Sequence, residues 1–354
     1  MFTTAWVNTM MAFFWAFSIA VFAVPSILYI AFRRSLFDMP NRRTVHESPI
    51  PRLGGIAIFA GFMSSIAIFG KFVALGQTPD GIQELFAGCI LIFFVGLKDD
   101  LVSVSAFKKL LGQVVAAGIV VLAGDIRLEN FYGFLGFETL DYGLSFALSF
   151  IIIIGITNAI NFIDGLDGLA GSIVLLMTTA LGYFFYLERE TYSYYIVCAC
   201  LGGAIIGFLR YNFYKAKIFM GDTGSLVIGF IIAVLALSFV RIQPGNLGDS
   251  SPVVVIAILF IPLIDTIRIF IIRTINGLSP FAPDKNHIHH RLLAKGLNSV
   301  QVVLLMLVFN LLLIISVVYF SYLDINILMG FIAFLGLIVI VLIELFTPKA
   351  QTNA

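Results

Sequence analysis

The chain has 354 residues, of which 60% are hydrophobic and only 12% are charged, and its mean hydropathy is +1.05. A soluble domain usually carries about a quarter charged residues, so a water-soluble protein of this size could not bury so much apolar surface in one core. The formal net charge of +1 and the lack of a basic run give no sign of a nucleic-acid partner. Composition therefore indicates a single membrane-embedded domain over residues 1–354.

Apolar runs long enough to cross a bilayer follow one another along the chain. They predict an all-α polytopic membrane protein with eleven transmembrane helices and no inserted soluble domain. The first run is too long for a signal peptide and has no Lys or Arg before it, so we interpret it as a retained anchor. The predicted helices cover residues 6–32, 54–72, 81–97, 110–123, 144–156, 169–186, 194–209, 226–240, 253–272, 302–320 and 325–346.

The basic residues are unevenly distributed between the loops that these helices define. Most of the 21 Lys and Arg residues lie in the loops after the odd-numbered helices or near the C-terminus. Because cytoplasmic loops collect Lys and Arg, the N-terminus is predicted to lie outside and the C-terminus in the cytoplasm. The external stretch 124–143 mixes glycine, aromatic and alternating polar residues, and a small β-hairpin is expected there.

Paired carboxylates mark the end of the third predicted helix, where Asp99 and Asp100 follow Lys98 and precede Lys108 and Lys109. Two carboxylates at a membrane surface are costly unless cations match them. A metal–phosphate site and an ordinary charged helix end explain this cluster equally well when it is considered alone.

A polar ridge follows the fifth predicted helix, where Asn158, Asn161, Asp164 and Asp167 recur at every third position. On a helix this spacing forms one slowly winding ridge. The glycine after each Asp allows a tight turn or a close backbone approach. Core packing does not require such residues at membrane depth, so a functional role is favoured over a solvated loop.

Two more clusters lie further along the chain, one at the start of the eighth predicted helix and one in the loop between the ninth and tenth. Asp222 lies between two glycines at the start of the eighth helix and suits a metal ligand approached by phosphate, although Thr223 and Ser225 also fit ordinary helix caps. His287, His289 and His290 lie within four residues, beside Arg291. With no cysteine nearby and carboxylates elsewhere, a hard cation such as Mg²⁺ is favoured over zinc.

The first predicted cytoplasmic loop is basic and rich in proline, and it ends in a double glycine at a helix start. Its arginines serve membrane orientation, but its prolines and histidine exceed what orientation requires. All five clusters are predicted at one membrane face. They imply phosphoryl transfer between a lipid phosphate and a soluble phosphate-bearing donor, with a divalent cation and basic residues neutralising the two anions. The residues of interest in this loop are Asp38, Pro40, Asn41, Arg42, Arg43, His46, Pro51, Arg52, Gly54 and Gly55.

Together, the five motifs resemble those of the polyprenyl-phosphate N-acetylhexosamine-1-phosphate transferases, or glycosyltransferase family 4. They occur in the order of that family and span Asp38 to Arg291. The His-Ile-His-His run is similar to the undecaprenyl-phosphate N-acetylglucosaminyl 1-phosphate transferase branch. The branch that uses UDP-N-acetylmuramoyl-pentapeptide typically carries three consecutive histidines, which this chain lacks.

The resemblance implies a role for each motif residue. The implied metal is Mg²⁺, with Mn²⁺ as a substitute, and its ligands would be Asp222, Asp99 and Asp167. The implied catalytic residues are Asp99, Asp100, Asp164, Asp167 and Lys109. The implied substrate-binding residues are Asp38, Asn41, Arg42, His46, Asn158, Asn161, His287, His289, His290 and Arg291.

The implied reaction is that of EC class 2.7.8, and it joins undecaprenyl phosphate to UDP-N-acetylglucosamine. It gives undecaprenyl-diphospho-N-acetylglucosamine and UMP, as the first membrane step of a cell-surface polysaccharide pathway. A phosphate monoester has its second pKa near 6, so the lipid phosphate is mostly a dianion and direct attack is favoured over a covalent Asp intermediate. The implied location is the bacterial inner membrane with a cytoplasmic active site, and a homodimer is compatible with it.

Two alternatives remain open at this point. One is a sister transferase that uses another UDP-N-acetylhexosamine or UDP-N-acetylmuramoyl-pentapeptide. The other is a cation-coupled transporter, which needs acidic residues at mid-membrane and gates on both faces. The clustering of polar residues at one face disfavours the transporter.

Overall fold

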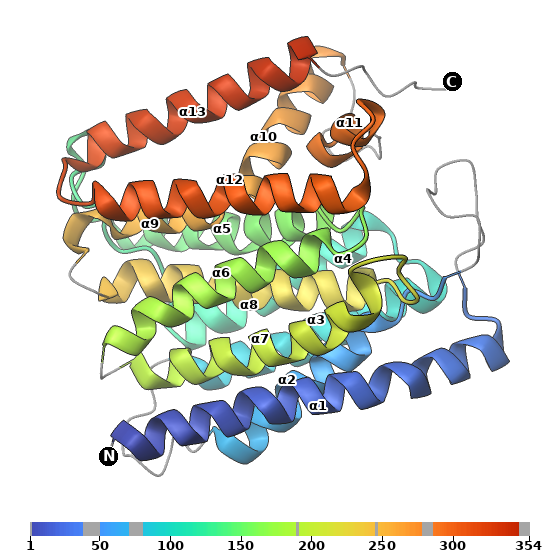
Figure 1. Ribbon diagram of the computed structural model, residues 1–354. Helices are drawn as coiled ribbons and strands as arrows, with labels where there is room; N and C mark the ends of the chain where they lie inside the picture. Colours follow the sequence, from blue (N-terminus) through green and yellow to red (C-terminus); the bar gives the residue numbers. More distant parts are fainter. Residues whose placement is uncertain are drawn as a thin grey trace.

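The computed structural model describes residues 2–37, 50–70, 81–188, 191–244, 247–277 and 286–346. Long helices lie side by side in a bundle, with the start of α1 and the end of α13 at opposite ends of it (Figure 1). The α-helices are α1 (Phe2–Arg34), α2 (Gly54–Phe69), α3 (Ile82–Val102), α4 (Ala106–Gly118), α5 (Tyr142–Phe162), α6 (Leu169–Leu187), α7 (Tyr192–Asn212), α8 (Gly221–Ile242), α9 (Ser251–Ile258), α10 (Phe260–Ile275), α11 (Ile288–Ala294), α12 (Ser299–Tyr319) and α13 (Ile325–Phe346). A π-helical turn, η2 (Ile119–Ala123), continues α4, and two 3₁₀ turns are η3 (Phe134–Gly136) and η6 (Gly248–Ser250).

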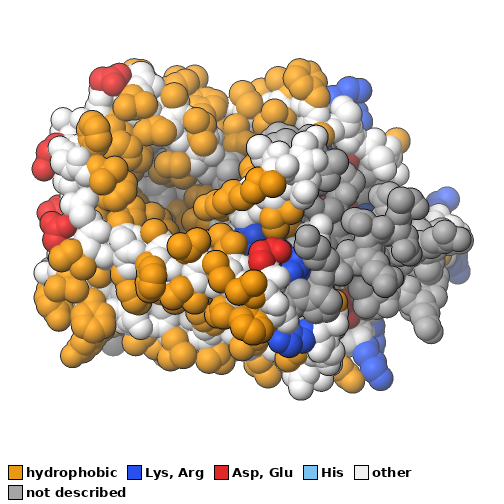
Figure 2. Space-filling model, turned by 90° about the horizontal axis from the view of Figure 1, so that it is seen from above, with side chains coloured by type: hydrophobic (Ala, Val, Ile, Leu, Met, Phe, Trp, Pro, Cys, Tyr) orange, Lys and Arg blue, Asp and Glu red, His pale blue; other side chains and the backbone are white. Residues whose placement is uncertain are grey.

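The outer surface of the bundle suits lipid. Within the described ranges, eight helices are long and apolar enough to cross a membrane: α1, α4 with η2, α5, α6, α7, α8, α12 and α13. The bent pair formed by η6–α9 and α10 makes a ninth if it counts as one span. Figure 2 shows hydrophobic side chains spread over a large part of the face that it draws. The chain is therefore a multi-pass membrane protein.

The prediction of eleven spans is supported in part. All eleven predicted segments fall on helices, but the described part of the chain supports eight or nine spans. α2 has only 16 residues, which at 1.5 Å per residue is shorter than the roughly 30 Å hydrocarbon core. α3 has 21 residues, but Lys98, Asp99 and Asp100 place three charges in its last turns.

The β-hairpin predicted for residues 124–143 does not form, and these residues contain no strand. A single antiparallel bridge joins Asn130 and Thr139, and Phe131 N donates to Glu138 O at 2.9 Å. The backbone curls after that bridge, because positive φ angles interrupt any extended run. The residues with positive φ are Tyr132, Gly133, Leu135 and Gly136.

α8 forms the centre of the bundle. Its neighbours include α2, α3, α5, α6 and α9, and 19 of its 22 residues are buried. Two glycines allow the neighbouring helices to approach its first turn: a Cβ on Gly55 would lie 2.1 Å from Gly224 N, and one on Gly96 would lie 2.6 Å from Asp222 O. The start of α8 is therefore enclosed by the start of α2 and the end of α3.

The span after α8 is broken between α9 and α10, which meet at an angle of 66°. Pro262 lies in the first turn of α10 and has no backbone N–H to donate to the carbonyl of Ile258. Asn310 of α12 replaces it, because its Nδ2 donates to Ile258 O at 3.2 Å. The bend thus has an identifiable cause, and the carbonyl that it frees is hydrogen-bonded.

Candidate active site

The site begins where the end of α3 meets the start of α8. Asp100 Oδ1 accepts from Asp222 N at 2.8 Å, and Asp100 Oδ2 accepts from Thr223 N at 2.9 Å and from the Thr223 hydroxyl. A helix N-terminus has unsatisfied amides and a partial positive charge, so a carboxylate from α3 stabilises it. Asp100 thereby caps α8 from another helix and fixes the direction of Asp222.

A lysine bridges two further carboxylates at this point. Lys109 Nζ, from α4, lies 2.6 Å from Asp222 Oδ2 and 3.1 Å from Asp99 Oδ2. Asp99 Oδ1 also accepts from Val104 N at 2.6 Å, which anchors that carboxylate in the turn between α3 and α4. Three helices thus bring two carboxylates to one ammonium group.

The polar ridge of α5 divides into two parts. Asn161 Nδ2 lies 3.2 Å from Asp222 Oδ1 and 2.7 Å from Ser225 Oγ, so Asn161 belongs to the carboxylate cluster. Asn158 instead pairs with Gln113 of α4, through Nδ2 to Oε1 at 2.6 Å and Nε2 to Oδ1 at 3.2 Å. Asn158 therefore joins α4 to α5, one turn before the cluster.

The loop between α5 and α6 carries the two remaining aspartates. Burial, together with the charges of Asp222 and Asp100, raises the pKa of Asp164 to about 7. Asp167 is directed to the other side, where its Oδ2 accepts from Ala216 N at 3.0 Å. Asp167 also borders a cavity of about 650 Å³, whose other lining residues are Ile50, Phe213, Tyr214, Lys215, Ala216, Asn298, Ser299, Val300 and Gln301.

The short helix α11 brings the histidines to this same loop. A Cβ on Gly165 would lie 2.6 Å from His289 Nε2, so the imidazole packs directly on the Asp-Gly-x-Asp-Gly turn. His289 is only 1% exposed, and neither ring nitrogen has a hydrogen-bond partner among the described residues. Burial is the main cause that lowers the pKa of His289 to about 3, so the ring is neutral at physiological pH.

The two neighbours of His289 in the motif have different surroundings. His290 is partly exposed, and its ring centroid lies 4.3 Å from that of His289. His287 Nδ1 lies 2.7 Å from Asp265 Oδ2, and Ile288 N donates to Asp265 Oδ1 at 2.8 Å. Asp265 of α10 therefore orients the first histidine and the start of α11 together.

Arg291 has a different environment from the one that its predicted role suggests. It is 1% exposed, and its guanidinium donates to Ile343 O at 2.9 Å and to Glu344 Oε2 at 3.3 Å. Its described partners therefore include the end of α13, and its role in nucleotide binding stays a prediction.

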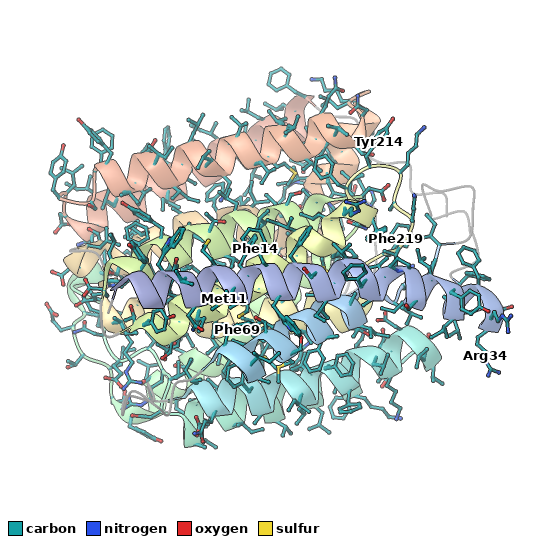
Figure 3. All side chains as sticks on the ribbon, turned by 60° about the horizontal axis from the view of Figure 1, so that its bottom comes forward. Met11, Phe14, Arg34, Phe69, Tyr214 and Phe219 are labelled. Carbon is teal, nitrogen blue, oxygen red and sulfur yellow. The ribbon has the colours of Figure 1, made fainter. Side chains whose placement is uncertain are left out.

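Four predicted substrate-binding residues, Asp38, Asn41, Arg42 and His46, lie outside the described residues. The end of that loop is described, and it joins the site: Gly54 N donates to Phe219 O at 2.9 Å and Gly55 N to Met220 O at 2.8 Å. Phe219 and Tyr214 lie at the end of the bundle where α1 reaches Arg34 (Figure 3). The described motifs thus meet at one end of the molecule.

The residues present fit a magnesium ion. Within the described ranges, no three His, Cys, Asp or Glu side chains form a ready-made metal site. Mg²⁺ is commonly held by one or two carboxylates together with substrate phosphates, so two such side chains would suffice, and the metal-ligand roles of Asp222 and Asp99 stay predictions. One oxygen of Asp167 already accepts from a backbone amide, and its role as a metal ligand stays a prediction.

Several residues that shape the site were not identified from the motifs. Gln113 pairs with Asn158, and Asn212 accepts from Gly168 N at 2.9 Å and donates to Ile218 O at 2.9 Å. Asp265 and Glu344 bind residues at the start and in the last turn of α11, the helix that carries the histidines. Asp265 and Glu344 could have been noticed, because each is an acidic residue inside a largely apolar predicted span.

Comparisons with known proteins identify the family. The model of the family described as "Glycosyl transferase family 4" matches residues 82–240, which include the clusters at Asp99, Asn161 and Asp222. A decaprenyl-phosphate N-acetylglucosaminephosphotransferase of Mycobacterium tuberculosis is 34% identical over 308 residues, covering 81% of this chain and 76% of that protein. The chain belongs to glycosyl transferase family 4.

Two more relatives of this family 4 enzyme support the assignment. A probable undecaprenyl-phosphate N-acetylglucosaminyl 1-phosphate transferase of Bacillus subtilis is 35% identical over 295 residues, with 82% of this chain and 79% of that protein covered. An undecaprenyl-phosphate alpha-N-acetylglucosaminyl 1-phosphate transferase of Escherichia coli is 30% identical over 277 residues, with coverage of 77% and 73%. The predicted family and enzyme class are confirmed, and a transporter is set aside.

Proposed function

We propose that this protein transfers N-acetylglucosamine 1-phosphate from UDP-N-acetylglucosamine to a polyprenyl phosphate. An oxygen of the lipid phosphate attacks the sugar-linked phosphorus, and the bond from that phosphorus to the bridging oxygen breaks. The products are polyprenyl-diphospho-N-acetylglucosamine and UMP. The carrier is undecaprenyl or decaprenyl phosphate, the two lipids in the names of the relatives.

The observation that carries this proposal is the convergence of Asp99, Lys109 and Asp222 with Asn161 at one helix end. Transfer between two phosphate groups requires positive charge where two anions meet. Lys109 supplies one such charge from the protein. When bound by Asp222 and Asp99, Mg²⁺ or Mn²⁺ would supply further positive charge to the diphosphate.

The contacts of the carboxylates support direct attack by the lipid phosphate. Both oxygens of Asp100 accept hydrogen bonds from the first turn of α8, and Asp99 is held by Val104 N and Lys109. A covalent Asp intermediate would require one of them to leave those partners. Asp99 and Asp100 therefore serve best as fixed anchors of Lys109 and Asp222.

The donor is expected to bind between the Asp-Gly-x-Asp-Gly turn and α11. His289 is buried and neutral there, so one ring nitrogen can donate a hydrogen bond and the other can accept one. The cavity beside Asp167 and Lys215 offers space for part of the nucleotide. An apolar carrier needs a hydrophobic surface, and Figure 2 shows a hollow bordered by hydrophobic side chains.

We infer that the site faces the cytoplasm of a bacterial inner membrane, because the relatives are bacterial and the predicted cytoplasmic loops hold most of the basic residues. Single cysteines at Lys295 and Glu138 test this orientation, since the native cysteines in the described ranges are buried. An impermeant thiol reagent added to intact cells should label only the cysteine at 138. Labelling at 295 would reverse the orientation.

The reaction itself is tested by UMP release from purified protein in detergent. UDP-N-acetylglucosamine, UDP-N-acetylgalactosamine and UDP-N-acetylmuramoyl-pentapeptide are each supplied with undecaprenyl or decaprenyl phosphate. The proposal expects lipid-dependent UMP release with UDP-N-acetylglucosamine and a lipid-linked diphosphosugar as product. Turnover only with another donor would assign the protein to a sister activity.

A further inference from the structure

We propose that Glu344, at the end of the last helix, is a positioning residue for the donor site. The inference rests on the proposed function, because it assumes that the histidines of α11 bind the UDP-sugar. In α13, Glu344 is the only ionisable residue among 22, and the rest of that helix is strongly apolar. A charged side chain inside a membrane helix is costly unless it has a specific partner.

Among the described residues, Glu344 pairs with two arginines that are both deeply buried. Its Oε1 accepts from Arg268 Nη2 at 2.6 Å and from Arg268 Nε at 3.0 Å, while its Oε2 lies 3.3 Å from Arg291 Nη1. Arg268 of α10 is 0% exposed and Arg291 of α11 is 1% exposed. One carboxylate thus connects three helices, at the end where α13 meets α10 and α11 (Figure 1).

The arginines also bind the backbone on either side of this contact. Arg268 Nη1 donates to Asn286 O, immediately before the first histidine, and Arg291 Nη2 donates to Ile343 O at 2.9 Å. Glu344 therefore balances two buried cations that together span α11. Removing its charge would leave both guanidinium groups buried with less compensation, and α11 would shift.

The helix that Glu344 holds cannot maintain its position alone. α11 has only seven residues, whereas an isolated helix shorter than about 12 residues is marginal in water. Asp265 ties the start of α11 through His287 and Ile288 N, and Glu344 ties its last turn through Arg291. Between these two anchors, His289 packs on Gly165.

These contacts assign different roles to the residues of α11 and α13. His289 touches the donor, while Arg291 acts through Glu344 to fix the helix that carries His289. The helix α13 therefore contributes to the donor site without contacting the substrate. Loss of Glu344 should weaken donor binding and leave the lipid-phosphate side, at Lys109 and Asp222, intact.

The test compares Glu344→Gln and Glu344→Asp with Glu138→Gln, a carboxylate variant in the loop between α4 and α5. Glu344→Gln should raise the KM for UDP-N-acetylglucosamine at least about tenfold and leave the KM for lipid phosphate unchanged. The reason is that the lost interactions bind the donor equally in the ground state and in the transition state. Glu344→Asp keeps the charge and should recover part of the loss. Glu138→Gln should behave as wild type. A folded Glu344→Gln with a normal donor KM would overturn the proposal.

A double variant shows whether Arg291 positions α11 or contacts the donor directly. It also limits misfolding caused by an uncompensated buried charge. Glu344→Gln combined with Arg291→Gln removes one charge of each sign, so the net charge of the cluster is unchanged. If Arg291 acts through Glu344, the double variant should be no worse in donor KM than Glu344→Gln alone. A full additional loss would mean that Arg291 contacts the nucleotide itself and would overturn this part of the proposal.

Hydrogen–deuterium exchange of the substrate-free protein gives a readout that does not depend on turnover. Glu344→Gln should speed exchange of the backbone amides in α11 and leave those of α8 unchanged. Unchanged exchange in α11 would overturn the positioning role. A wild-type protein that releases no UMP would refute the proposed function instead, while this comparison would still decide whether Glu344 holds α11.

Discussion

Lys109 Nζ lies 2.6 Å from Asp222 Oδ2, although the two residues are 113 positions apart in the chain. This contact joins α4 to the first turn of α8. Because Asp99 approaches the same ammonium group, Lys109 keeps two carboxylates close together that would otherwise repel each other.

We expect Lys109→Gln to lower kcat/KM for UMP release by at least about a hundredfold, since a preorganised charge at the reacting phosphates is lost. The adjacent Lys108 is exposed and provides the matched control. Lys108→Gln should retain near-normal turnover in the same assay. Equal losses in the two variants would mean that general surface charge, rather than the bridge, supports activity.

Removal of the metal should abolish turnover. Adding the metal back should restore turnover in the wild-type protein but not in Asp222→Asn. After chelation, added Mg²⁺ or Mn²⁺ should restore UMP release in the wild-type protein. In Asp222→Asn, turnover should stay at least about a hundredfold lower even at saturating metal, because the amide keeps the shape but lacks the charge. Near-normal turnover of this variant would remove Asp222 from the metal site.

Asp100→Asn should destabilise the protein, because the carboxylate of Asp100 caps the buried start of α8. The free energy of unfolding should fall by about 1–3 kcal/mol, the usual cost of leaving buried donors unsatisfied. Asp141 also caps a helix by accepting from Leu144 N, but this cap is exposed. Asp141→Asn should therefore change the free energy of unfolding very little, because Asn caps a helix about as well as Asp. Equal unfolding midpoints for the two variants in a denaturant titration would contradict the capping role.

Gly165→Ala should displace His289, because the added Cβ would lie 2.6 Å from Nε2. We expect a higher KM for UDP-N-acetylglucosamine and an unchanged KM for the lipid phosphate. Gly155→Ala, ten residues earlier on α5, adds a Cβ that meets nothing within 4 Å and serves as the control. A normal donor KM in Gly165→Ala would separate His289 from donor binding.

Metal affinity should depend on pH through Asp164, whose pKa is raised to about 7. Below that pH the neutral carboxyl is favoured, and above it the carboxylate attracts cations, so Mg²⁺ affinity should increase as the pH rises from about 6 to about 8. Binding is measured on the protein alone, because the lipid phosphate also titrates near pH 6. Asp164→Asn should flatten this dependence, and an unchanged slope would exclude Asp164 as its cause.

The sequence predicted the helices and the meeting of the motifs, because both depend on local patterns. The eleven segments predicted from apolar runs all fall on helices, and the resemblance of the motifs to a family implied that Asn161, Lys109 and Asp222 belong to one site. The number of crossings was less predictable. Whether a segment such as α2 crosses depends on its final length, which apolar composition defines only loosely.

The roles of the individual carboxylates could not be read from their motifs. Asp99 and Asp100 are adjacent, yet one binds Lys109 and the other caps α8, because successive helical residues point about 100° apart. Arg291 belongs to a histidine motif but contacts Glu344, which lies 53 positions further along the chain. Such assignments depend on long-range packing that no local pattern specifies.

The central place of α8 also has a consequence for biogenesis. The helix is among the most hydrophobic of the bundle, so it can enter the bilayer by itself during synthesis, yet in the finished protein almost none of it touches lipid. Its partners α2, α3 and α5 are made earlier, whereas α9 is made later. A ribosome stalled between α8 and α9 would hold a chain in which the carboxylate cluster is already synthesised. The side of α8 that α9 later covers would still face lipid. Activity should therefore appear late in translation, when α9 closes that flank and α11 and α13 complete the donor side.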